Sequence, residues 1–172
     1  MTEPGPKAGR RASREPKHPK SCQERALGLL AVRPRTRQEL ERRLLQAKFP
    51  VEEVHDVLER LERVDLINDR EFAEQFAQHQ FSVKHAGRRG VLQALLAKGV
   101  DRDLAEMVTE QGPGDEDARA EHLAAARASR MVGVDPAKAH ARLTGILMRR
   151  GHSPETARRA ARRALDLEDA QE

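Results

Sequence analysis

Side chains that could perform catalysis or hold a metal ion are present, but their spacing fits neither task. The seven histidines never fall four residues apart with a glutamate between them, which is the spacing of a helical zinc site. No glycine-rich loop has the pattern of a phosphate cradle. The sequence therefore predicts no catalytic residue, no metal and no cofactor, and we expect a protein that is not an enzyme.

Two weaker arrangements also favour ordinary structural roles. His79 and His85 flank Phe81 and could bind a metal ion together, but hydrogen-bonded or solvated histidines are far commoner. Cys22 is the single cysteine, so intramolecular disulfides and multi-cysteine metal sites are excluded. We expect this thiol to be structural or simply free.

The strongest signal for function is positive charge near the C-terminal end. Residues 138–163 contain eight lysines and arginines and a single acid, Glu155. Within this segment a helical periodicity puts four alanines on one face and four arginines on the opposite face. Like charges four residues apart repel one another, so a polyanionic partner would explain the pattern, although a merely solvated face is the alternative. The candidate binding residues here are Arg149, Arg150, Arg158, Arg159, Arg162 and Arg163.

A second, smaller basic cluster lies in the middle of the chain, at Lys84, His85, Arg88 and Arg89 around Gly87. It could contact phosphate or an acidic protein. The chain has no Trp or Tyr and only four Phe, so stacking on nucleobases is not expected. Any contact with nucleic acid should therefore be weak, electrostatic, sensitive to salt and independent of base sequence.

The elements that position these cations are predicted to be helices. The 172 residues are 35% charged and poor in aromatic residues, so the core must consist of Leu, Val and Ala. Apolar residues recur at helical spacing and no segment alternates like a strand. Capping boxes at Ser21, Thr36 and Asn68, each with Glu three residues later, mark helix starts, as do Asp101, Asp135 and Ser153. We expect nine helices and an all-α fold.

Three similar segments indicate an internal repeat. They begin at residues 44, 94 and 146 and align with Lys48, Lys98 and Arg150 in register, and Gly99 and Gly151 follow as candidate left-handed caps. Stacked units of three helices predict an elongated, curved rod. The expected parts are a basic disordered tail (1–20), three three-helix repeats (21–67, 68–112 and 113–167) and an acidic tail (168–172).

Localisation follows from features that the sequence lacks. No segment approaches the roughly 20 apolar residues of a membrane span, and the N-terminus has no apolar signal-peptide core. With a single cysteine, the sequence is typical of a soluble protein of the reducing cytoplasm.

Three motifs in order resemble the RecX family, bacterial regulatory proteins that restrain the RecA recombinase. They are "TRQELERRLLQAKFPVEEVHDVLERL", the junction "DLINDREFAEQF" and "GRRGVLQALLAKGV". The junction is expected to set the angle between the first two repeats through a capping box and a hydrophobic staple of Ile67 on Phe72. Its structural residues are Ile67, Asn68, Asp69, Glu71 and Phe72. The chain departs from the family pattern at three places. Asp65 stands in place of Gly, Phe49 in place of the glycine of the first turn, and Gly90-Val91 where the family usually has Arg-Ile or a similar pair.

The resemblance implies a monomeric rod that lies along the RecA filament on single-stranded DNA. Such a protein blocks filament extension and lowers the ATPase, strand-exchange and coprotease activities of RecA, in homologous recombination, DNA repair and the SOS response. Two other functions fit the residues. One is a helix-turn-helix-like DNA-binding module at residues 139–165 that acts without RecA. The other is a helical-repeat adaptor for an unrelated acidic protein.

Overall fold

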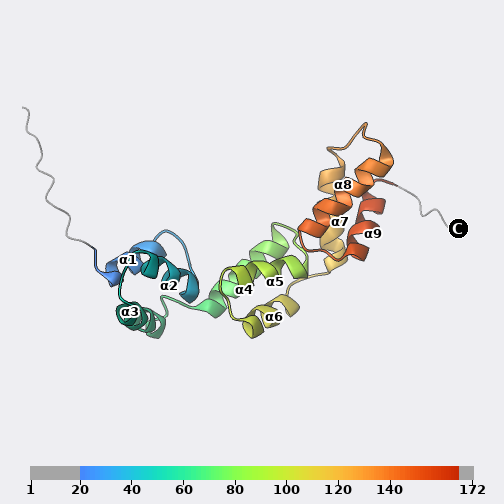
Figure 1. Ribbon diagram of the computed structural model, residues 1–172. Helices are drawn as coiled ribbons and strands as arrows, with labels where there is room; N and C mark the ends of the chain where they lie inside the picture. Colours follow the sequence, from blue (N-terminus) through green and yellow to red (C-terminus); the bar gives the residue numbers. More distant parts are fainter. Residues whose placement is uncertain (1–19, 167–172) are drawn as a thin grey trace, which may run out of the picture.

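The computed structural model describes residues 20–166, which form nine helices and no strand. The helices lie in three groups that follow one another along the chain (Figure 1). We call α1–α3 repeat 1, α4–α6 repeat 2 and α7–α9 repeat 3. The predicted all-α repeat fold is therefore confirmed, whereas the basic and acidic tails lie outside the described residues, apart from Lys20. The helices are α1 (Cys22–Leu30), α2 (Arg37–Gln46), α3 (Val51–Arg63), α4 (Asp69–Ser82), α5 (Arg88–Ala97), α6 (Arg102–Glu110), α7 (Glu116–Ala128), α8 (Pro136–Arg149) and α9 (Pro154–Ala164).

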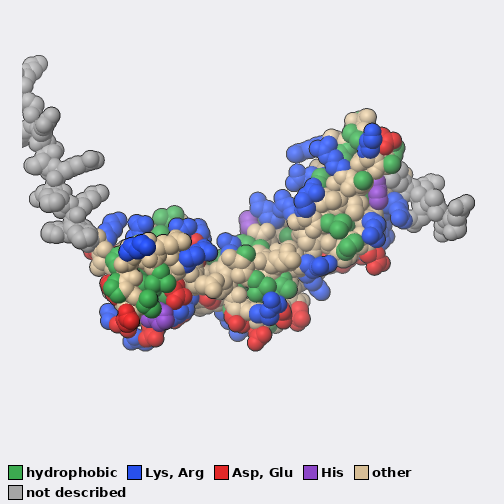
Figure 2. Space-filling view, in the orientation of Figure 1, with side chains coloured by type: hydrophobic (Ala, Val, Ile, Leu, Met, Phe, Trp, Pro, Cys, Tyr) green, Lys and Arg blue, Asp and Glu red, His purple; other side chains and the backbone are tan. Residues whose placement is uncertain are grey.

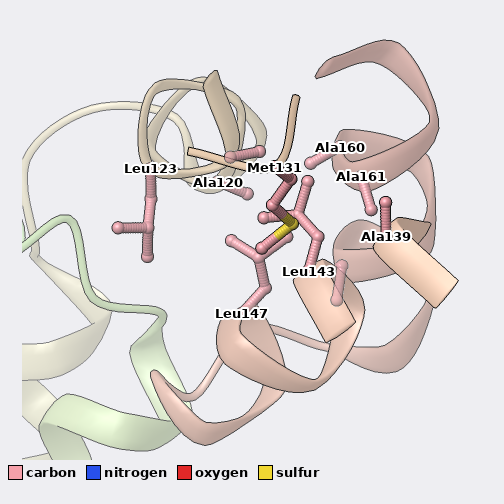
Figure 3. Packing of buried hydrophobic residues seen from close by; sticks show 10 residues of the cluster. Ala120, Leu123, Met131, Ala139, Leu143, Leu147, Ala160 and Ala161 are labelled. Atoms are coloured by element: carbon pink, nitrogen blue, oxygen red, sulfur yellow. The ribbon is translucent and has the colours of Figure 1, made fainter. Parts of the chain in front are cut away.

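Each repeat encloses its own hydrophobic core, and all the closely packed helix pairs lie within one repeat. The core of repeat 1 contains mainly leucine and valine, and that of repeat 2 is built around Phe81. The core of repeat 3 is rich in alanine, and Met131 from the loop after α7 fills the space beside Leu143 and Leu147 (Figure 3). Small side chains let α7, α8 and α9 pack closely. Helices of 9 to 14 residues are marginal alone, so these cores stabilise them.

Helix starts agree with the predicted caps, but only one of the three predicted capping boxes is complete. Ser21 and Glu24 satisfy each other's backbone N–H groups in both directions. At Asn68 the side chain accepts the Glu71 N–H, but the Glu71 carboxylate turns to Gln75 instead. The Thr36 box is likewise half formed, because its glutamate binds three arginines, Arg33, Arg35 and Arg43.

The tight turn after the second helix of each repeat contains a residue with positive φ. These residues are Lys48 (φ 69°), Gly99 (φ 83°) and Gly151 (φ 88°). The amide two residues after each helix cap closes the turn in all three repeats, through Phe49 to Leu44, Val100 to Leu95 and His152 to Leu147. The predicted left-handed glycines are confirmed. The predicted alignment of Lys48 with Lys98 and Arg150 is wrong by one residue, however, because Lys48, and not Phe49, occupies the place of the glycine.

Neighbouring repeats dock in the same way at both junctions. The start of the second helix in one repeat packs on the tight turn of the next repeat. At the first junction, Thr36 Oγ1 donates to the Lys98 carbonyl at 2.5 Å. At the second, the Gly87 N–H donates to the Arg150 carbonyl at 2.9 Å. Lys98 and Arg150 are the equivalent C-cap residues of α5 and α8. Each pair of neighbouring repeats is therefore joined by a hydrogen bond to the same position of the turn.

Candidate interaction surface

The second junction brings together the two basic clusters that the sequence separates by about sixty residues. Arg88 and Arg89 form the first turn of α5 and follow Gly87, whose N–H binds the Arg150 carbonyl. The approach depends on glycine: a Cβ atom on Gly90 would lie 2.5 Å from the Arg150 oxygen, and one on Gly87 2.3 Å from the Gly151 oxygen. The fold therefore places Arg88 and Arg89 beside the turn that carries Arg149 and Arg150.

We call Lys84, Arg88, Arg89, Arg149 and Arg150 the junction cluster. All are exposed except Arg150, which is half-buried, and within residues 20–166 none of these side chains has an ion-pair partner. Glu106 and Glu110 line a small cleft of about 170 Å³ together with Arg88 and Arg89, so some acid lies nearby. Two arginines at a helix N-terminus oppose the helix dipole, which makes this placement unfavourable for stability alone.

A second set of exposed cations lies along α8, and we call Lys138, Arg142 and Arg149 the α8 stripe. The helix contains no acidic residue, and its buried residues, Ala139, Leu143 and Leu147, lie on a different face from the stripe. In the described part of the chain, no carboxylate forms an ion pair with the stripe. Figure 2 shows Lys and Arg side chains gathered along the edge of repeat 3. Arg149 belongs to both sets and joins them.

The predicted arginine face of α9 is only partly available. Three of its four alanines are buried as expected and Ala164 is partly buried. However, Arg159 lies 2.5 Å from Asp117, and Arg163 pairs with Glu121, both on α7. The Arg159 guanidinium holds the pKa of the Asp117 carboxyl below its ordinary value. Arg159 and Arg163 therefore already have carboxylate partners on α7, which offset part of the repulsion that suggested a polyanionic partner. Arg162 also has a partner, and Arg158 is exposed.

Histidines contribute to the second junction as structural groups. His152 is 2% exposed, and its Nε2 donates to the His85 carbonyl at 2.9 Å. Its Nδ1 lies 3.6 Å from Glu116 Oε1, and the rings of His85 and His122 are 4.2 Å apart. Burial lowers the pKa of both His85 and His152. In the described residues, no group of three or more potential ligands could hold a metal ion.

Arg119 is the least expected member of this junction. Only 7% of this arginine is exposed, and its guanidinium donates to the carbonyls of Ala86, Pro113 and Gly114. It also lies over the Phe81 ring, 4.6 Å from the centroid. Sequence reasoning missed it because all its partners except Phe81 are backbone oxygens, which leave no trace in residue types.

The predicted junction between repeats 1 and 2 is more than a helix start. Asn68 caps α4, while the next residue, Asp69, accepts the Arg37 N–H at 2.8 Å and thereby caps α2 of the preceding repeat. Burial raises the pKa of the Asp69 carboxyl. Ile67 belongs to the core of repeat 1 and Phe72 packs against that of repeat 2, so the residues on either side of this cap are anchored in different cores. The staple of Ile67 on Phe72 stays a prediction.

Between residues 20 and 166 no helix is both long and apolar enough to cross a membrane.

Comparison with known proteins gives one consistent result. Residues 22–61 match the family model for the first three-helix domain of RecX, and residues 68–108 match the model for the second. The regulatory protein RecX of Streptomyces coelicolor is 35% identical over 143 residues, which cover 83% of this chain and 76% of that protein. The regulatory protein RecX of Mycobacterium tuberculosis is 39% identical over 131 residues, covering 73% and 75%.

Solved structures agree on the fold. The crystal structure of RecX from Lactobacillus salivarius superposes with a TM-score of 0.69 at 23% identity, over 85% of this chain and 95% of that one. This chain and that RecX structure thus share the same fold.

Proposed function

Because the chain belongs to the RecX family of regulatory proteins, we propose that it binds RecA and the RecA filament on single-stranded DNA. In this proposal it blocks filament extension and lowers the ATPase, strand-exchange and coprotease activities of RecA. It acts as a monomer in the cytoplasm, in homologous recombination, DNA repair and the SOS response. The RecX family is a regulatory family and not a known enzyme family.

The elongated row of repeats supports binding along an extended partner. Each repeat has a separate core and docks on the next through a small number of contacts, so the row exposes much surface for its volume. Such a shape suits contact with several subunits of a filament. It is poorly suited to enclosing a small substrate.

The observation that carries the DNA part of the proposal is the set of cations without ion-pair partners in the described residues. The junction cluster and the α8 stripe together offer six exposed cations, Lys84, Arg88, Arg89, Lys138, Arg142 and Arg149. If all six contact phosphates of a single strand, affinity should fall about 300-fold between 50 and 200 mM salt, from a slope of about 0.7 per contact. The carboxylates that pair Arg159 and Arg163 reduce the expected contribution of α9.

The decisive test is RecA-dependent ATP hydrolysis on single-stranded DNA with the purified protein added. We expect hydrolysis to slow and preformed filaments to shorten in electron micrographs. A protein that leaves both the hydrolysis rate and the filament length unchanged would refute the proposal.

The same preparation tests the alternative of a DNA-binding module that acts without RecA. That function would use α9 as a recognition helix, but Arg159 and Arg163 on this helix are engaged with α7. We therefore expect no sequence-specific binding to duplex DNA. An adaptor for another acidic protein would bind neither RecA nor DNA and would be found by capture from the native lysate.

A further inference from the structure

A cleft of about 430 Å³ opens between repeats 1 and 2, on a part of the molecule that the basic residues do not explain. It lies between the end of α1, the chain before α2 and the start of α4. Its walls are mainly apolar. They are formed by Leu27, Leu30, Ala31, Pro34, Leu66 and Phe72.

Two leucines in these walls are unusually open to solvent. Leu66 is 52% exposed and Leu27 is 38% exposed. Neighbouring apolar side chains that line one concave site are the feature that marks interaction surfaces, whereas single exposed leucines are ordinary. The cleft therefore offers apolar surface that a partner side chain could cover.

The rim of the cleft carries negative charge. Asp65 and Glu71 are both exposed, and each accepts a hydrogen bond only from a neutral amide, of Asn68 and Gln75 respectively. The one cation in the lining, Arg35, is already occupied, since its guanidinium binds Glu39 and the Leu29 carbonyl. The charges left for a partner are thus two carboxylates, which repel phosphate and attract a lysine or arginine.

One of these two acidic residues, Asp65, has a strained backbone conformation. Asp65 has a φ of 58°, in the left-handed region that favours glycine. Aspartate tolerates this region better than most residues, but glycine would adopt it without strain. A carboxylate at this position therefore gives the rim a charge that the turn itself does not require.

We propose that this cleft binds a protein segment in which an apolar side chain stands next to a lysine or arginine. The apolar side chain would lie between Leu27, Leu66 and Phe72, and the cation beside Asp65 and Glu71. This inference rests on the proposed function, in which the segment belongs to a recombinase subunit. Repeats 1 and 2 then bind protein, while the junction cluster and the α8 stripe bind the phosphates of DNA.

The test is Leu66→Glu, with Val51→Glu as its matched control. Both residues are 52% exposed and both lie in repeat 1, but Val51 is at the start of α3 and does not line the cleft. We expect Leu66→Glu to weaken binding to RecA filaments at least tenfold and to leave the salt-dependent binding of bare single-stranded DNA unchanged. Val51→Glu should change neither. Filament binding by Leu66→Glu at the wild-type level would overturn the inference.

A second variant tests the rim without adding charge to an apolar wall. The double change Asp65→Asn and Glu71→Gln keeps the hydrogen-bonding shape of both side chains, and Asn accepts the positive φ of Asp65. We expect severalfold weaker filament binding at low salt and wild-type binding at high salt. Equal binding at low salt would overturn the assignment of a cation to the partner segment.

Other occupants and a failure of the proposed function give different results. If the chain's own residues 1–19 fill the cleft, their removal should strengthen filament binding; if a second copy fills it, sedimentation should reveal a dimer that Leu66→Glu abolishes. Either result would overturn the inference, and so would wild-type protein that fails to bind RecA at all, which refutes the proposed function as well.

Discussion

The contact between repeats 2 and 3 should fail when Gly151 is replaced by alanine. Gly151 has a φ of 88°, and a Cβ atom added there would lie 2.0 Å from the Gly90 nitrogen and 2.3 Å from its Cα. Both neighbours are backbone atoms of the preceding repeat, repeat 2, so no flexible side chain can move aside. The change therefore combines backbone strain with a collision.

A second glycine separates these two effects. Gly133, in the loop between α7 and α8, has a φ of 80°, and a Cβ atom there would meet nothing within 4 Å. Gly133→Ala should cost only the left-handed penalty, about 1 to 2 kcal/mol. Gly151→Ala should cost about 1 to 3 kcal/mol more, because it also forces packed groups apart. At this chain length the additional destabilisation corresponds to a melting temperature lower by about 2 to 12 °C.

Relief of the collision should come from separation of the two repeats. The cores of repeats 2 and 3 share no buried residue, so each can stay folded while the junction opens. We therefore expect the Gly87 amide, which binds the Arg150 carbonyl, to lose protection from hydrogen exchange in Gly151→Ala. The assays are thermal unfolding followed by circular dichroism and hydrogen exchange of both variants. Equal melting temperatures and equal protection in the two variants would refute the reasoning.

The remaining predictions concern pH and charge. Because burial lowers the pKa of His85 and His152 below the ordinary 6.5, the unfolded chain binds protons first as the pH falls. The stability that depends on the neutral histidines should thus be fully present above about pH 6.5 and should decline below it. Melting temperatures measured at pH 7.5 and 5.5 should therefore fall more in the wild type than in His152→Gln. Arg149→Ala should weaken binding to single-stranded DNA and reduce its salt slope by about 0.7, without a change in melting temperature. Arg159→Ala, which removes the ion pair to Asp117, should instead lower the melting temperature and leave the salt dependence of DNA binding at its wild-type value. A reduced salt dependence in Arg159→Ala together with an unchanged one in Arg149→Ala would show that α9 and not α8 faces the DNA.

Local chemistry explains which structural features could be predicted. Helix caps such as Asp101, Asp135 and Ser153 act on N–H groups two or three residues away, so they can be read directly from the sequence. Glycines at positive φ, such as Gly99 and Gly151, are equally local. Periodic apolar residues then identify the buried face of each helix. The helix boundaries, the buried faces and the internal repeat together are sufficient to predict an all-α fold of three-helix units.

The features that could not be predicted depend on residues far apart in the chain. The acids that pair with Arg159 and Arg163 lie 42 residues earlier, on α7, and nothing in their local sequence distinguishes them from solvated carboxylates. The cap that Asp69 provides for α2 crosses a repeat boundary for the same reason. The register of repeat 1 was misaligned because the aligned lysines, Lys48 and Lys98, occupy different positions of the same turn. The two basic clusters are visible in the sequence as separate groups of residues, but their union at one junction depends on the close approach of Gly87, Gly90 and Gly151.

The turn at Lys48 limits how this protein could change its length in evolution. The equivalent turns of repeats 2 and 3 accept a preceding repeat at glycines, where a Cβ atom would lie 2.0 Å from its neighbour. Lys48 holds the same backbone conformation with a side chain attached, so a unit added in front of repeat 1 would meet that side chain. At the other end, the start of α8 is exposed at Asp135 and Pro136 and remains open to a turn of the same kind. Duplication of repeat 2 or repeat 3 should therefore be tolerated, whereas a unit in front of repeat 1, or a second copy of repeat 1, would first require a change of Lys48 to glycine.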